Sequence, residues 1–162
     1  MSHDRDEVQA AVDRYCELRD AIANGDETWT ALADLFTHDA VYIDPAWGRI
    51  EGVVEIRQFL EESMLGLEDW DFPIEFTAIE GDDVIIKWTQ QLPGTREDGR
   101  RFEQSGFSRL VYAGDGKFRY EEDILNMAHV MEDLTRSGWQ PKDGFTMPPQ
   151  VPERDFRLPN SR

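Results

Sequence analysis

Three acidic side chains stand where a carboxylate could exchange protons with a small molecule. Asp44 ends an apolar segment and is followed by Pro45, while Glu121 and Asp123 alternate along a later segment. A carboxylate in a largely apolar cavity can take a proton from a carbon next to a carbonyl group and return it elsewhere. Two plainer interpretations compete, because Asp-Pro is a common turn and an acidic run is usually a solvated face.

Ligand-binding candidates share strand faces with these acids. Strand alternation groups Tyr42 with Asp44, Trp88 with Gln90, Glu121 with Asp123, and Ser105 with Phe107 and Arg109. Inward-facing acids need a counter-charge, and Arg109 could supply it. A purely structural ion pair of Arg109 with Asp123 or Glu121 is the alternative. Trp47 and Trp88 would suit a flat hydrophobic ligand, although each could equally be a core aromatic.

Composition removes several classes of function. The 162 residues fit one domain, and 34 acidic against 17 basic side chains give a net charge of −17. Such a chain should not bind nucleic acid or an anionic membrane, because both need a positive field. A single cysteine cannot form a disulfide within the chain. The histidines lack the spacing of metal ligands, so we expect no metal site. The acidic first residues lack an apolar signal segment, so we expect a cytoplasmic protein.

Apolar spacing predicts helices first and strands afterwards. Helices are expected over 8–22, 28–36, 53–67 and 126–137, and strands over 40–44, 48–51, 72–80, 84–92, 102–112 and 117–125. This order indicates an α+β fold, in which a strongly curved antiparallel sheet wraps around three to four helices. The cone-shaped domain, residues 1–139, should enclose an apolar cavity.

A proline-rich tail, residues 140–162, follows that domain. It holds five of the eight prolines, so it cannot be a regular helix or a central strand. We expect it to be extended and to pack on the domain or on a partner subunit. A disordered tail is the alternative.

Two segments resemble a known family. Residues 14–18 (RYCEL) lie on the first helix, and residues 35–45 (LFTHDAVYIDP) lead into Asp44. With the element order, they resemble the nuclear-transport-factor-two-like superfamily, and within it the ketosteroid isomerases and the SnoaL-like polyketide cyclases. The resemblance spans about residues 8 to 137 and leaves out the tail.

The resemblance implies roles for the candidate residues. Asp44 matches the general base of the isomerases, Tyr15 their oxyanion donor, and Asp123 an acid/base of the cyclases. It also implies that a cavity is lined by Tyr42, Trp47, Trp88, Gln90, Ser105, Phe107, Arg109 and Glu121. Ser105 falls where the isomerases place a protonated aspartate, and a serine donates a weaker hydrogen bond. Tyr15 could alternatively be a core tyrosine.

Two functions follow as expectations. The first is a cofactor-free enzyme that transfers protons on a hydrophobic, steroid- or polyketide-like carbonyl compound. The second is a non-catalytic module that binds a hydrophobic metabolite. A less favoured version, an epoxide hydrolase, would activate water with Asp44, Arg109 and Asp123. The resemblance also implies a homodimer formed through the sheet face away from the cavity.

Overall fold

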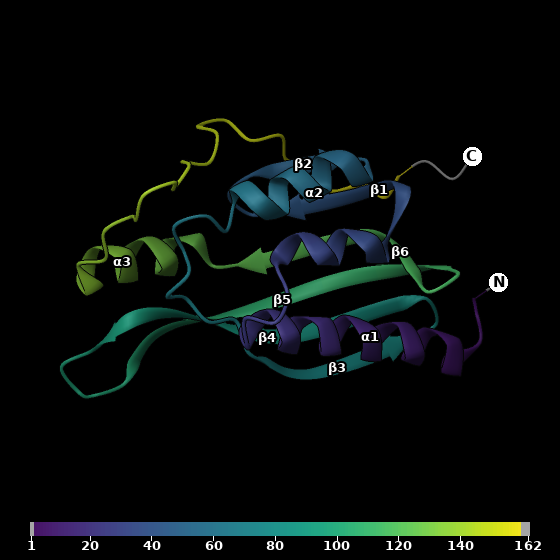
Figure 1. Cartoon of the computed structure of the whole chain (residues 1–162), viewed down its shortest axis with the longest axis horizontal. Coiled ribbons are helices and arrows are strands. Elements are labelled where there is room, and N and C mark those ends of the chain that lie inside the picture. Colours follow the sequence, from purple (N-terminus) through teal and green to yellow (C-terminus); the bar gives the residue numbers. More distant parts are fainter. Residues whose placement is uncertain (1, 160–162) are drawn as a thin grey trace.

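The computed structural model describes residues 2–159 (Figure 1). Its helices are α1 (Arg5–Ala23), the 3₁₀ helix η1 (Trp29–Leu35), α2 (Val53–Glu62) and α3 (Met127–Ser137). Its strands are β1 (Phe36–Asp44), β2 (Gly48–Glu51), β3 (Ile74–Glu80), β4 (Asp83–Thr95), β5 (Arg101–Gly114) and β6 (Lys117–Leu125). The expected α+β class is confirmed. Within this range, no helix has the length and apolar character needed to cross a bilayer.

The strands form one open sheet in the order β2-β1-β6-β5-β4-β3. Neighbouring strands are antiparallel except for β1 and β6, which run parallel. The sheet is therefore mixed. The antiparallel meander β3 to β6 places its last strand, β6, beside β1, and these two strands run in the same direction. This parallel pairing sets Tyr42 of β1 directly opposite Glu121 of β6.

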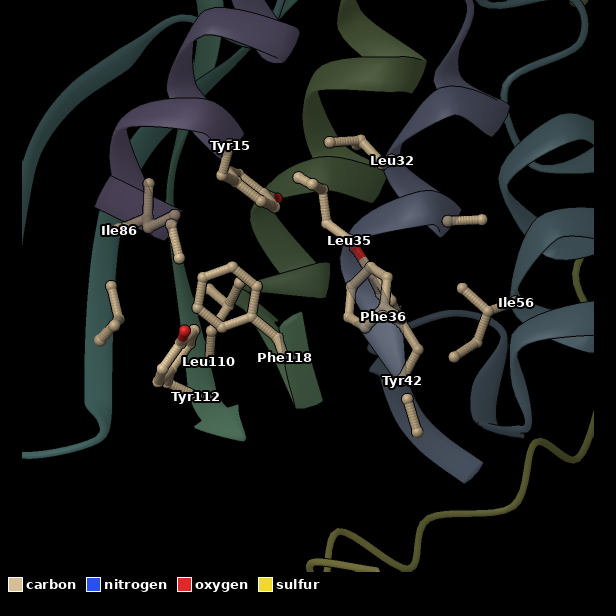
Figure 2. Close-up of a cluster of buried hydrophobic side chains, with 14 of the residues drawn as sticks. Tyr15, Leu32, Leu35, Phe36, Tyr42, Ile56, Ile86, Leu110, Tyr112 and Phe118 are labelled. Carbon is tan, nitrogen blue, oxygen red and sulfur yellow. The ribbon is translucent and has the colours of Figure 1, made fainter. Parts of the chain in front are cut away.

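The helices cover one face of the sheet, and the hydrophobic core lies between the helices and that face. Along α1 the buried side chains recur at helical spacing, from Val8 through Val12 and Tyr15 to Arg19. Asp4 caps this helix by accepting a hydrogen bond from the backbone N–H of Asp6 at 2.9 Å. Figure 2 shows Tyr15 reaching from α1 into the cluster, with its hydroxyl end directed toward that of Tyr42.

Several element boundaries differ from those expected, among them the start of β1 and the ends of α2 and β4. Strand β1 begins at Phe36, so residues 37–39 extend the strand instead of separating it from the helix. Helix α2 ends at Glu62, because the chain turns at Gly66, where φ is +84° and the Cβ of Phe145 leaves no room for a side chain. Strand β4 continues to Thr95, which pairs with Arg101 and shortens the expected hairpin loop.

The C-terminal tail packs on its own domain. Beyond α3 it runs past α2 and β2 toward β1 (Figure 1). Arg49 of β2 donates from its backbone N–H to the carbonyl oxygen of Glu153 at 2.9 Å, and from Nη1 to those of Asp155 and Arg157 at 3.0 and 2.7 Å. Leu158 packs against Val41, Ile43, Val111 and Tyr120 on the outer sheet face. The last three residues of the predicted tail, 160–162, lie outside the described range.

Candidate active site

A cavity of about 200 Å³ opens between the helices and the sheet. Its wall is mostly apolar and comes from α1, η1, α2, α3, strands β1, β4, β5 and β6, and the start of the tail. Seven of the predicted site residues line it, namely Tyr15, Tyr42, Asp44, Trp47, Trp88, Gln90 and Asp123. The sequence therefore brings most of its candidates to one place.

Asp123 receives hydrogen bonds on both carboxyl oxygens. Tyr42 donates its hydroxyl to Oδ2 at 2.6 Å, and Ser108 donates its own to Oδ1 at 2.5 Å. The indole N–H of Trp88 in turn donates to the Ser108 oxygen at 2.9 Å. Trp88 comes this close because its ring lies over Gly106, where an added Cβ would approach the ring to 2.7 Å. Burial raises the pKa of Asp123, while these two hydroxyl donors work to lower it.

Glu121 lies behind the cavity wall, only 1% exposed. Its Oε1 accepts the Tyr15 hydroxyl at 2.8 Å and lies 3.4 Å from the Tyr42 hydroxyl, whereas Oε2 is buried without a hydrogen-bond partner. Burial, together with the nearby charge of Asp123, raises the pKa of Glu121 well above its usual range. Glu121 is joined to Asp123 through Tyr42, whose hydroxyl lies within hydrogen-bond distance of both carboxyl groups.

Asp44 combines a turn with a cavity position. Its Oδ1 accepts the backbone N–H groups of Ala46 and Trp47, each at 2.8 Å, which fixes the side chain. Burial raises the pKa of Asp44 to about 6, with a smaller contribution from the charge of Asp123 and against the effect of the two N–H groups. The turn and the acid/base interpretations of Asp44-Pro45 are thus compatible.

Tyr15 is placed differently from an oxyanion donor. It lines the cavity, but its hydroxyl donates to Glu121, and Arg19 approaches the same oxygen at 3.4 Å. Burial, chiefly, and the charge of Glu121 raise its pKa well above 10.0. In this arrangement, the Tyr15 hydroxyl donates its hydrogen bond to Glu121 and not into the cavity.

Ser105, Phe107 and Arg109 do not face the cavity, so that expectation is wrong. On β5 the inward side chains are Gln104, Ser108 and Leu110, together with Gly106, and the predicted ones alternate on the outer face. The ladder between β5 and β6 shifts register between Val111 and Tyr112. The shift leaves the alternation along β5 regular, because Leu110 and Tyr112 both lie in the inner core cluster and Val111 lies in the outer one. The family-based placement of Ser105 therefore fell on the wrong face, an odd number of residues away from the inward positions.

Arg109 therefore has another partner. Its guanidinium pairs with Asp83 at 2.6 Å on the outer surface. This geometry removes both the Arg109 ion pair with Glu121 or Asp123 and the epoxide-hydrolase arrangement, because Arg109 cannot contact the cavity acids through the sheet.

Sequence reasoning missed two features of the wall. Arg19 lines the cavity one helical turn beyond Tyr15, and its position in the apolar stripe of α1 was the available signal. Gln90 begins a buried polar chain through Gln104 to Asp133 of α3, whose two carboxyl oxygens both accept from Nη2 of Arg96, at 2.7 and 2.8 Å. Nothing in the sequence spacing indicated this chain. In the described range, no three His, Cys, Asp or Glu side chains gather as a metal-binding group.

Solved structures share this fold. A proposed SnoaL-like polyketide cyclase from Jannaschia sp. CCS1 has a TM-score of 0.64 at 17% identity, over 83% of this chain and 97% of that one. A second structure is a hypothetical protein with a ketosteroid isomerase-like fold from Catenulispora acidiphila DSM 44928, in complex with trimethylamine. It has a TM-score of 0.59 at 22% identity, over 81% of this chain and 97% of that one. A nuclear-transport-factor-two-like protein of unknown function from Exiguobacterium sp. 255-15 has a TM-score of 0.54 at 22% identity, over 72% of this chain and 98% of that one.

The sequence comparison agrees with the fold. No curated protein matches the chain. The sequence model of the SnoaL-like domain matches residues 7–121, which is more than half of the chain and includes Tyr15, Tyr42, Asp44 and Glu121. The protein therefore belongs to the SnoaL-like domain family.

Proposed function

We propose that the protein is an enzyme that moves protons on a hydrophobic carbonyl compound of steroid or polyketide type. The observation that carries the proposal is the pair of carboxyl groups, Asp44 and Asp123, on the wall of one apolar cavity. Burial raises the pKa of both groups, and a general acid or base works best when its pKa is near the working pH.

Asp44 acts as the base. Its Oδ1 is held by the turn, so Oδ2 is left to approach the substrate. Above pH 6 or so Asp44 is mostly ionised and can remove a proton from the carbon next to the carbonyl group.

Asp123 acts as the proton donor to the carbonyl oxygen. When Asp123 is protonated, it donates to that oxygen as the enol forms and becomes a carboxylate, which the Tyr42 and Ser108 hydroxyls stabilise by donating to it. Asp44 then reprotonates the enol at another carbon while the enol hydroxyl returns its proton to Asp123, so that both carboxyl groups regain their starting states and no cofactor is consumed.

Asp44→Asn and Asp123→Asn test this proposal with a panel of flat ketones. Each variant should lose about 100-fold or more of turnover, as expected for loss of a general acid or base. The matched control is Asp39→Asn, because Asp39 is an exposed aspartate on the same strand as Asp44. Turnover that survives both cavity substitutions would reject the mechanism.

A non-catalytic binding module is the second candidate. It is favoured by the Tyr15 hydroxyl, which is donated to Glu121 and so is not free for an enolate oxygen. This function predicts saturable binding of hydrophobic ligands without turnover of any member of a ketone panel. Product formed from one ketone by the wild-type protein, and not by Asp44→Asn, would exclude it.

A further inference from the structure

Arg19 is a buried cation without an ionic partner. Its residue is 9% exposed, and no carboxylate oxygen in the described range lies within 4 Å of its guanidinium. A buried charge that lacks both solvent and a counter-ion is costly, so natural proteins usually pair it. This residue therefore needs an explanation beyond packing.

Neutral groups hold the Arg19 side chain in place. Nη2 donates to the carbonyl oxygen of Phe72 at 2.8 Å, and Nη1 makes only a long contact of 3.4 Å with the Tyr15 hydroxyl. The guanidinium lies over the Trp29 ring at 4.9 Å. A guanidinium has five N–H donors, and most of them remain available in this arrangement.

A second cavity adjoins the first one at Arg19. It has a volume of about 540 Å³ and lies at the end of α1, beside η1 and the segment after α2. Arg19, Trp29, Met64, Leu67, Trp70 and Phe72 line both cavities. Arg19 is the only basic residue that lines either cavity within residues 2–159. A ligand in either space can therefore reach the guanidinium.

Glu121 does not contact Arg19 directly. Tyr15 separates the guanidinium from Glu121, and burial keeps the pKa of Glu121 well above its usual range. No direct ion pair therefore joins Arg19 to Glu121. The positive charge is thus left for a molecule that enters the cavity.

We propose that Arg19 is a specificity-determining residue that binds a carboxylate on the substrate. This inference rests on the proposed function for the reacting end, and it narrows the substrate to a flat, hydrophobic carbonyl compound that carries a carboxylate. Arg19 and Asp123 belong to the wall of the same cavity, so one molecule can place its carboxylate at Arg19 and its carbonyl group at Asp123. Trp29 and Phe72 flank the carboxylate end with aromatic surface.

The test compares three ligands of nearly one shape in binding experiments, namely 2-naphthoate, 2-naphthamide and 2-naphthylmethylammonium. The wild-type protein at neutral pH should bind the carboxylate about tenfold or more tightly than the amide, and the ammonium most weakly. Calorimetry measures all three without any turnover, so the result does not depend on whether the protein is an enzyme.

Two variants assign the preference to Arg19. Arg19→Gln keeps donors for Phe72 but removes the charge, and it should abolish the preference for naphthoate over naphthamide. Arg14→Gln changes the net charge equally on the exposed side of the same helix and should leave the preference intact.

Several results would overturn the inference. They are equal or tighter binding of the amide or the ammonium by the wild type, no naphthoate binding at millimolar concentration, and a preference that survives Arg19→Gln. If Arg19→Gln does not fold, the wild-type comparison alone still decides. Turnover of neutral ketones without any carboxylate preference would reject this inference and leave the proton-transfer function standing.

Discussion

The hydroxyl of Tyr42 lies 2.6 Å from Oδ2 of Asp123 and 3.4 Å from Oε1 of Glu121. One hydroxyl group thus lies between two buried carboxyl groups of the same strand. The arrangement follows from the parallel pairing of β1 with β6, which sets Tyr42 opposite Glu121, and from strand alternation, which places Asp123 on the same face. Two carboxyls joined in this way titrate as a pair.

Tyr42→Phe should weaken turnover and shift the titration of this pair. The Tyr42 hydrogen bonds lower the pKa of both Asp123 and Glu121, so their removal should raise both values further. Loss of one hydrogen bond to a charged group should reduce turnover about 10- to 100-fold. Carbon-detected NMR titration of the carboxyl groups and a pH–rate profile measure the two effects.

The control for Tyr42→Phe is Tyr120→Phe. Tyr120 is a buried tyrosine whose hydroxyl lies beside Glu122 and the tail rather than beside the cavity. An unchanged titration of Glu121 and Asp123 in Tyr42→Phe would show that the hydroxyl does not couple them.

Asp44→Asn should stabilise the protein at alkaline pH while it removes activity. The folded pKa of about 6 lies above the reference value of 3.8, so the folded state binds the proton more tightly than the unfolded state. This contribution to stability is fully present below the unfolded pKa and is lost as pH rises through about 6. An asparagine is neutral at every pH, so its advantage near pH 8 should be up to about 3 kcal/mol and should vanish near pH 4.

Urea unfolding of the wild type and of Asp44→Asn at several pH values measures this difference. The exposed Asp39→Asn variant serves as the control and should follow the wild type. A constant difference between Asp44→Asn and the wild type from acid to alkaline pH would contradict a raised pKa for Asp44.

Arg96→Met should destabilise the protein through α3. Asp133 is 5% exposed and accepts from both Arg96 and Gln104, so removal of the guanidinium leaves a buried carboxylate without its counter-ion. Breaking a buried ion pair in this way typically costs about 3–5 kcal/mol. Because the Arg96 side chain is partly exposed, we expect the lower end of that range in the free energy of unfolding.

Arg101→Met provides the comparison, since Arg101 pairs with Asp71 on the surface. Its loss should cost no more than about 1 kcal/mol. Equal effects of the two substitutions would show that the Arg96–Asp133 pair has no special role in holding α3.

The expected homodimer remains a prediction, and the outer sheet face provides its test. Phe76, Lys87, Phe107 and Ile124 form a row across β3 to β6, and the three apolar members are each more than 40% exposed. The tail covers a different part of this face, around Tyr120. If two copies meet on this row, Phe107→Asp should reduce the mass in solution to that of a monomer.

Analytical ultracentrifugation measures that mass, and Val54→Asp provides the control, because Val54 is an exposed apolar residue on α2. A wild-type protein that is monomeric at high concentration would reject the dimer. Deletion of residues 140–162 tests the expected contribution of the tail separately, and an unchanged mass would limit the tail to its own domain.

Local patterns were sufficient to predict most elements and most of the residues that line the cavity among the candidates. Helical spacing located α1 and thus Tyr15, and the Asp44-Pro45 step marked the end of β1 at the cavity. These predictions succeeded because each depends on a few neighbouring residues. The parallel pairing of β1 with β6 depends on contacts between distant segments, and sequence periodicity does not contain that information.

The errors have two distinct physical causes. Ser108, not Ser105, contacts Asp123, because the inward positions of β5 run through Gln104, Gly106 and Ser108, and the placement of Ser105 taken from the resemblance was an odd number of residues away. Arg19 is absent from the predicted site residues, because a charged residue on an amphipathic helix usually lies on the solvated face. Its spacing from Tyr15, one turn along the apolar stripe, was the evidence against that assumption.

The segment that closes the cavity lies outside the part of the chain shared with the family. The family match ends at residue 121, whereas Asp123, α3 and the tail residues Trp139, Phe145 and Pro148 complete the cavity wall. The shared part supplies the sheet, Asp44 and Tyr15. Substitutions in the tail can therefore reshape the space available to a ligand without disturbing the core. The shape of the cavity can then diverge through the tail while Asp44 and Tyr15 stay where they are.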